Sequence, residues 1–134
     1  MANDRIAASG LWGTIEWAVD STGRLPAREF FELLNPDQRT KVLALFKRFA
    51  DFGPLNNREK FRSLGGQGGR GGKDLFEFKS FQVRLIGDFR KGRRFLVAHG
   101  LIKKQGRLRP QDVARAVRIL EQNDHFETER EQRR

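Results

Sequence analysis

The chain has 134 residues, enough for one domain with its own hydrophobic core, and it contains no cysteine. The missing thiols exclude disulfides, cysteine nucleophiles and cysteine-ligated metal sites, and they fit a reducing, cytoplasmic compartment. No stretch approaches the roughly 20 apolar residues of a membrane span, and no apolar signal segment follows the N-terminus, so we expect a soluble protein.

The positive charge is concentrated in one segment of the chain. The formal net charge is +10, but residues 1–57 hold seven basic and seven acidic residues, which cancel. Residues 58–118 hold seventeen basic and five acidic residues, a net +12, and residues 119–134 carry −2. Nucleic acid is the partner that this distribution favours. A membrane surface fits less well, because the basic residues fall mostly on predicted strands and loops rather than on an amphipathic helix.

The first half of the chain predicts one strand followed by two helices. Residues 1–13 are expected to be flexible, and the apolar alternation over residues 14–19 indicates a strand. A short helix is expected over residues 27–34. An Asn-Pro-Asp sequence at 35–37 then starts a second helix over residues 36–52, which a Gly-Pro pair ends. The short connection predicts that the two helices form an antiparallel hairpin.

The second half predicts strands and a last helix. After a glycine-rich loop at residues 65–72, three strands are expected at residues 75–79, 81–89 and 94–99. The continuously apolar run at residues 95–98 indicates a central strand covered on both sides. Phe81 is expected on the same face of its strand as Val83.

The C-terminal helix is expected to run from Pro110 to Leu120. Residues 121–134 form a charged tail, either a frayed extension of this helix or disordered. The order β-α-α-β-β-β-α predicts a single α+β domain over residues 14–120, with helices against one face of a mostly antiparallel sheet.

The glycine-rich loop spells G-x-G-x-x-G over residues 66–71. A dinucleotide-binding fingerprint needs a strand before it and a helix after it, whereas a strand follows here. A Walker A loop is excluded because Gln67 stands in place of its first glycine and Asp74 in place of its hydroxyl residue. The segment is therefore interpreted as a flexible loop, whose Arg70 and Lys73 can contact a nucleic-acid backbone.

The acidic and histidine residues show no metal-ligand or carboxylate-pair spacing, so no metal or other cofactor is expected. Glu77 and Asp88 are expected to be cross-strand partners of nearby cations. His99 ends an apolar strand beside several cations, where it is either a hydrogen-bonded structural residue or a proton-transfer group at phosphate. His125 is expected to be solvated in the tail.

Several cations are expected to converge on one face of the sheet. Arg84 points to the polar face of the middle strand, Lys79 lies on the adjacent strand, and Lys103 and Lys104 follow the third. With His99, this set suits cleavage of RNA without a metal, because the cations offset the charge on a pentavalent phosphate and the 2′-hydroxyl serves as nucleophile. The alternative is that these residues bind phosphate without cleaving it. Further RNA contacts are expected from Arg58, Lys60, Arg62, Arg70, Lys73, Arg90, Lys91 and Arg93.

The order of elements, the His-Gly-x-x-Lys-Lys run at residues 99–104 and the proline-started helix rich in Ala and Arg resemble the RelE/HigB-like toxins of type II toxin–antitoxin systems. The phage-derived HigB-like branch is the most similar, and the resemblance covers roughly residues 14–120. It implies a small mRNA endoribonuclease that often acts on the ribosome and inhibits translation. It also implies a cognate antitoxin, expected to be a helix-turn-helix protein.

By position, the resemblance implies that Arg84 contacts the scissile phosphate and that Lys79 is a basic neighbour. His99, Lys103 and Lys104 would form the cluster at the strand end. The chain departs from the family pattern in having no tyrosine and in its glycine-rich insertion. Two other functions stay open: a ParE-like toxin that inhibits DNA gyrase by binding, and a non-enzymatic nucleic-acid-binding module.

Overall fold

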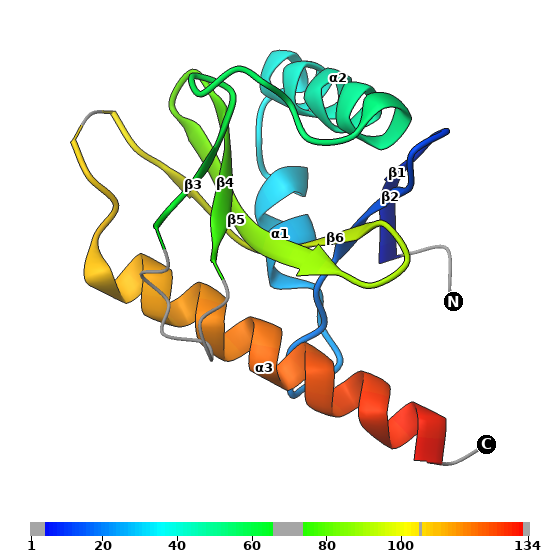
Figure 1. Cartoon of the computed structure of the whole chain (residues 1–134). Coiled ribbons are helices and arrows are strands. Elements are labelled where there is room, and N and C mark those ends of the chain that lie inside the picture. The colour runs from blue at the N-terminus through cyan, green and yellow to red at the C-terminus, as the bar shows by residue number, and fades with distance from the viewer. Residues whose placement is uncertain (1–4, 66–73, 105, 133–134) are drawn as a thin grey trace.

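The computed structural model describes residues 5–65, 74–104 and 106–132. Within these residues the chain forms a mixed α+β fold of six strands and three helices (Figure 1). The strands are β1 (Ile6–Ser9), β2 (Thr14–Trp17), β3 (Phe61–Ser63), β4 (Phe76–Ser80), β5 (Val83–Arg90) and β6 (Arg94–Ile102). The helices are α1 (Pro26–Glu32), α2 (Pro36–Phe52) and α3 (Pro110–Gln132).

The strands make one sheet in the order β1-β2-β6-β5-β4-β3. The pairing of β2 with β6 is parallel and all other pairings are antiparallel. The predicted α+β fold with a mostly antiparallel sheet is therefore confirmed. The predicted bounds of α2 are confirmed as well, and its N-terminus is a capping box in which Asn35 and Gln38 bond reciprocally.

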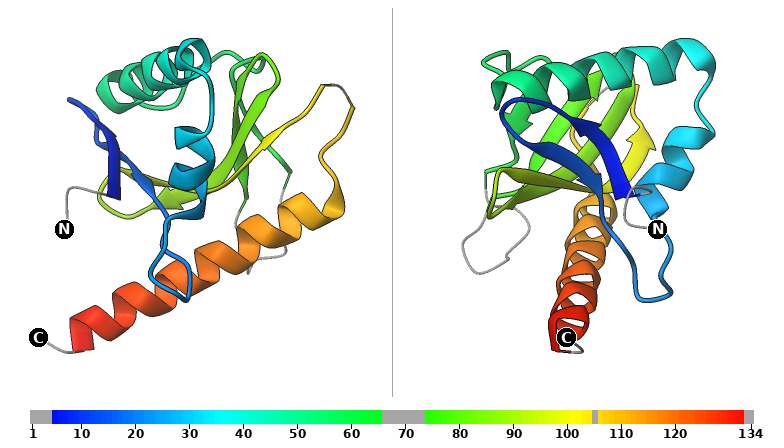
Figure 2. Two further views of the ribbon diagram at one scale, coloured as in Figure 1. Left: turned by 180° about the vertical axis from the view of Figure 1, so that it is seen from behind. Right: turned by 90° about the vertical axis from the view of Figure 1, so that its right-hand side faces the viewer.

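Helices cover both faces of the sheet, so the expectation that they cover one face is wrong. Figure 2 shows α1 and α2 on one side of the sheet and α3 across the other. The reason lies in β6, whose apolar run is buried on both sides. Phe95 and Val97 belong to the core under α1 and α2, whereas Leu96 and Ala98 belong to the core under α3.

The expected antiparallel helical hairpin is not formed. Helix α1 packs against β6, and α2 crosses above it at a steep angle (Figures 1 and 2). Each helix thus contacts the sheet, which buries more of its apolar surface than pairing with the other helix alone.

Two segments expected to lack regular structure are ordered. Strand β1 lies within residues 1–13, where it pairs with β2, and the turn after it bonds to α2 through Trp12 and Gly13 N–H groups donating to the Ala50 carbonyl. Helix α3 continues through most of the tail, so the helical alternative for that segment is the one observed. Asn123 holds this part of the helix, because its Oδ1 accepts from the Val19 N–H at 2.9 Å and from Arg5 at 2.6 Å.

Candidate functional site

The register of three neighbouring strands brings the predicted catalytic residues to one end of the sheet. Lys79 of β4 lies opposite Arg84 of β5, which lies opposite Leu101 of β6. Directly opposed residues of antiparallel strands share a face, and Leu101 packs against the core under α3. Lys79 and Arg84 therefore project on the α3 side of the sheet, where both are half-buried.

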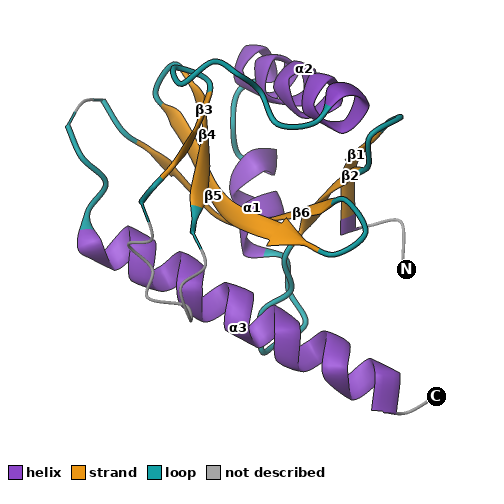
Figure 3. Cartoon of the chain, in the orientation of Figure 1, coloured by secondary structure: helices purple, strands orange, loops and turns teal. Residues whose placement is uncertain are grey.

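Arg84 is held at the turn that joins β4 to β5. Its guanidinium donates to the carbonyls of Phe81 and Val83. The end of β6 runs beside the same turn, because the Lys103 N–H donates to the Gln82 carbonyl at 2.7 Å. Lys103 is half-buried, and Lys104 next to it is exposed at the start of the loop that leads to α3 (Figure 3).

His99 lies one row further along the same face. It pairs with Ile86, two residues from Arg84, which makes Arg84 and His99 diagonal neighbours at the spacing of about 7–8 Å usual in antiparallel sheets. The His99 Nε2 lies 2.9 Å from Asp112 Oδ1 in the first turn of α3, and the side chain is 13% exposed. Asp112 Oδ2 also accepts from Arg109 Nε at 3.2 Å.

Burial is the main cause that lowers the pKa of His99 below its usual 6.5, and Arg115 and Arg109 lower it further, against the opposing effect of Asp112. Burial alone would raise the pKa of Asp112, but hydrogen bonds from His99 and Arg109 outweigh it and the pKa is lowered. At neutral pH the pair is therefore a neutral imidazole beside a carboxylate. The carboxylate next to Nε2 assigns the proton to that nitrogen, which leaves Nδ1 as the basic atom. Nδ1 makes no hydrogen bond to a described residue.

Close packing against α1 explains why a glycine occupies position 100 in the His-Gly-x-x-Lys-Lys run. A Cβ atom added at this position would overlap the ring of Phe30 in α1. The glycine lets β6 approach α1 on one face while His99 contacts α3 on the other.

The two buried carboxylates in the sheet pair with cations, Glu77 across strands as predicted and Asp88 with Arg90 of its own strand. Glu77 is fully buried, and its Oε1 accepts from Arg62 Nε at 2.5 Å, while Oε2 has no partner among the described residues. Asp88 is bonded by Arg90. These carboxylates stabilise the sheet and do not form an acid–base pair.

The residues expected to contact RNA differ in their exposure and in their distance from Arg84. Arg90 is mostly buried and bound to Asp88 and to both oxygens of Asp124, so its role is structural. Lys91 and Arg93 are exposed at the β5–β6 turn, about 23 Å along the strand from Arg84 at roughly 3.3 Å per residue.

The remaining predicted contacts are nearer to the site or outside the described residues. Lys60 lies beside Lys79, whose N–H donates to the Lys60 carbonyl at 2.8 Å, and Arg58 is exposed in the preceding turn. Arg62 keeps 37% of its side chain exposed while it pairs with Glu77. Arg70 and Lys73 lie outside the residues that the structure describes.

Sequence reasoning missed Phe81 as a surface residue. It lies in the β4–β5 turn rather than in a strand, it is 72% exposed, and Lys41 and Lys60 lie over its ring. The available signal was the length of the connection, because the predicted strands at residues 75–79 and 81–89 leave only one residue between them. A tight hairpin commonly needs two residues, and in the structure Ser80 pairs with Val83, so that Phe81 and Gln82 form a two-residue turn.

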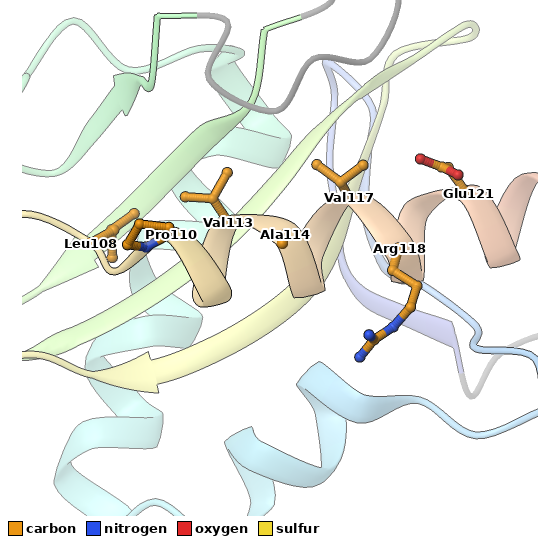
Figure 4. Close-up of a pocket in the computed structure, with 7 residues that line it drawn as sticks. All are labelled: Leu108, Pro110, Val113, Ala114, Val117, Arg118 and Glu121. Carbon is orange, nitrogen blue, oxygen red and sulfur yellow. The ribbon is translucent and has the colours of Figure 1, made fainter.

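An open groove of about 440 Å³ runs along α3, lined by Val113 and Val117, which also pack against the core under this helix (Figure 4). In Figure 4, Arg118 and Glu121 are its charged lining residues. Among the described residues, no three His, Asp or Glu side chains gather closely enough to hold a metal ion. No helix in the described part is long and apolar enough to cross a membrane.

One known protein family matches the chain. The profile of the family described as phage-derived protein Gp49-like (DUF891) matches residues 29–121, which is well over half of the sequence. The chain belongs to the phage-derived Gp49-like family. Membership in the Gp49-like family is compatible with a toxin of a toxin–antitoxin system, and so suggests an antitoxin partner. The matched range includes Arg84 and the run at 99–104. No curated protein and no solved structure matches the chain.

Proposed function

We propose that this Gp49-like protein is the toxin of a type II toxin–antitoxin system and that it cleaves mRNA without a metal ion. The observation that carries the proposal is the shared face of Arg84 and His99, with Lys79 and Lys103 beside them. A neutral histidine held by a carboxylate and surrounded by cations is a suitable arrangement for proton transfer at a phosphodiester.

In this mechanism His99 Nδ1 accepts the proton of the RNA 2′-hydroxyl. The 2′-oxygen then bonds to the adjacent phosphorus, and the bond from phosphorus to the 5′-oxygen breaks. Arg84 and Lys103 offset the negative charge that develops on the phosphorane, and a lysine ammonium of the site protonates the leaving 5′-oxygen. The products are a 2′,3′-cyclic phosphate and a 5′-hydroxyl.

The other cations have a binding role in this proposal. Lys79 and Lys104 hold the phosphates next to the scissile one, because point charges at the rim of a site position the backbone without reading its sequence. The cognate antitoxin, proposed to be a small helix-turn-helix protein, would neutralise the toxin by covering this face.

The test is cleavage of mRNA by the purified protein, with and without ribosomes, in the presence of EDTA. We expect cleavage by the wild type and strong losses in Arg84→Ala and His99→Gln, where the glutamine keeps a donor toward Asp112. Arg24→Ala, an exposed arginine that belongs to neither the site nor the expected RNA contacts, is the control and should retain activity. Equal cleavage by the wild type and both site variants would refute the proposed site.

A second function is favoured by one observation. The contact with Asp112 satisfies His99 and leaves little of its side chain exposed, as expected for a residue that only joins α3 to β6. The protein would then inhibit DNA gyrase by binding, as ParE-like toxins do. Inhibition of gyrase supercoiling by both the wild type and Arg84→Ala, without RNA cleavage, would support this function.

A further inference from the structure

A second surface begins at the turn between β4 and β5, next to the candidate site. Phe81 is the first residue of this two-residue turn and has a φ of 55°, in the left-handed region where glycine is usual. Its ring is nevertheless 72% exposed. A bulky side chain held in water by a strained backbone contributes little to the core, and such strain points to a functional position.

Cations surround this exposed ring. The Lys41 Nζ lies 4.5 Å and the Lys60 Nζ 5.5 Å from the Phe81 ring centroid. Lys41 also pairs with Asp37 at 2.9 Å, but both side chains are well exposed, so the pair contributes little energy and leaves the ammonium available to another anion.

A groove of about 670 Å³ lies between Phe81 and the outer side of α2. A second aromatic ring, Phe52 at the end of α2, is 77% exposed in this groove. An adjoining cavity of about 570 Å³ shares Phe52 and continues along residues 53–57. The described lining holds four cations and one acid: Lys41, Lys47, Arg48, Lys60 and Asp51.

We propose that this groove binds single-stranded RNA next to the cleaved bond, with Phe81 and Phe52 stacking on bases and Lys41, Arg48 and Lys60 contacting phosphates. Exposed rings alternating with cations are the arrangement that binds single strands without sequence preference. The inference rests on the proposed function, since it names where the flanking nucleotides of that substrate lie.

The groove and the candidate site lie on opposite faces of the sheet and meet at the β4–β5 turn, where Phe81 lines the groove and Arg84 begins the site. The Arg84 guanidinium donates to the Phe81 carbonyl, and the Lys103 N–H donates to the Gln82 carbonyl. A strand whose phosphate is held by Arg84 therefore meets the turn directly. The rival occupant, an acidic amphipathic helix of a protein partner, needs a broad apolar stripe. Between the two rings, however, α2 offers only Ala44 and the half-buried Leu45.

The test is binding of a fluorescein-labelled, about 12-nucleotide 2′-O-methyl RNA, measured by fluorescence anisotropy. This probe cannot be cleaved, so binding is measured separately from catalysis. We expect Phe81→Gly and Phe52→Ala each to weaken affinity about fivefold or more. Lys41→Ala/Lys60→Ala should lower the slope of log affinity against log salt by about 1.4, because about 0.7 is lost per phosphate contact on a single strand.

The controls separate loss of binding from loss of folding. Glycine adopts the positive φ of position 81 without strain, so the thermal stability of Phe81→Gly should equal or exceed that of the wild type. Two control variants should bind RNA normally: Leu33→Ala, at an 87% exposed residue that follows the last residue of α1, and Arg24→Ala/Arg130→Ala, outside the groove lining.

Each outcome decides one of the two proposals. Unchanged affinity and salt slope in the groove variants would overturn the inference, as would loss of antitoxin binding alone, which would assign the groove to a protein. Oligonucleotide binding that depends on Phe81, in a protein that cleaves no RNA, would support the inference and refute the proposed nuclease.

Discussion

The His99 Nε2 lies 2.9 Å from Asp112 Oδ1, so a carboxylate in the first turn of α3 holds the only histidine of the described sheet. The contact joins β6 to α3 and orients the imidazole with Nδ1 away from the carboxylate. The same hydrogen bond therefore makes a structural contact and gives the orientation that the proposed catalysis requires. Variants at Asp112 can distinguish these two roles.

Asp112→Asn should slow RNA cleavage about tenfold or more, because the amide no longer fixes the tautomer of His99. The carboxylate raises the pKa of His99, so its removal should lower that pKa further. NMR titration of the His99 ring measures the pKa, and the RNA cleavage assay measures the rate. An increase in the His99 pKa, or an unchanged cleavage rate, would contradict this role for Asp112.

The stability of the protein should depend on pH through His99. Burial lowers its pKa in the folded state below the usual 6.5, so between these two pKa values the unfolded chain binds more protons. The free energy of unfolding should therefore rise with pH across this window. The contribution that neutral His99 makes to stability should be lost as pH falls below about 6.5. Urea unfolding at a series of pH values measures the slope, and His99→Gln should reduce it. A slope of opposite sign, or one that the variant keeps, would refute the assignment.

Much of the fold could be predicted from local patterns. The Asn-Pro-Asp start and the 3.6-residue apolar spacing gave the bounds of α2, and the apolar run of β6 indicated burial on both faces. That same run also implied a helix on the second face. The prediction placed all helices on one face, because it treated β6 and the C-terminal helix separately. Strand β1 (sequence IAAS) shows no apolar–polar alternation and β3 has only three residues, so only pairing with their neighbours defines these strands.

Gly100→Ala should destabilise the protein by about 1–3 kcal/mol, because the added methyl would overlap the Phe30 ring. The matched test is a double-mutant cycle, measured by urea unfolding. In a Phe30→Ala background the same glycine substitution should cost little, since the ring is gone. A cost that does not depend on Phe30 would show that the glycine is needed for another reason.

Asn123→Ala should destabilise the protein by about 1–3 kcal/mol, because it leaves the buried Val19 N–H without an acceptor and removes a contact of Arg5. Thermal unfolding measures the loss. Thr128→Ala, exposed on the same helix, is the control and should lie within about 0.5 kcal/mol of the wild type. If both variants behaved alike, this part of α3 would not be anchored as described.

The candidate site was harder to predict than the fold. Alternation along β5 placed Arg84 correctly on the face opposite Val83 and Leu85, although this face is covered by α3. The register that sets Arg84 opposite Lys79 and Leu101 is a tertiary property. Asp112 could not be found from spacing, because thirteen residues and a loop separate it from His99. Charge alone also grouped Arg90 with the RNA contacts, although nearby carboxylates give it a structural role.

The most direct test of the proposed chemistry uses an RNA in which the nucleotide at the cleaved position carries a 2′-deoxy sugar. The 2′-hydroxyl is the nucleophile in the proposed reaction, so we expect the all-ribose RNA to yield a 2′,3′-cyclic phosphate and the substituted RNA to remain intact at that position. Cleavage at the deoxy position at an unchanged rate would contradict the proposed mechanism.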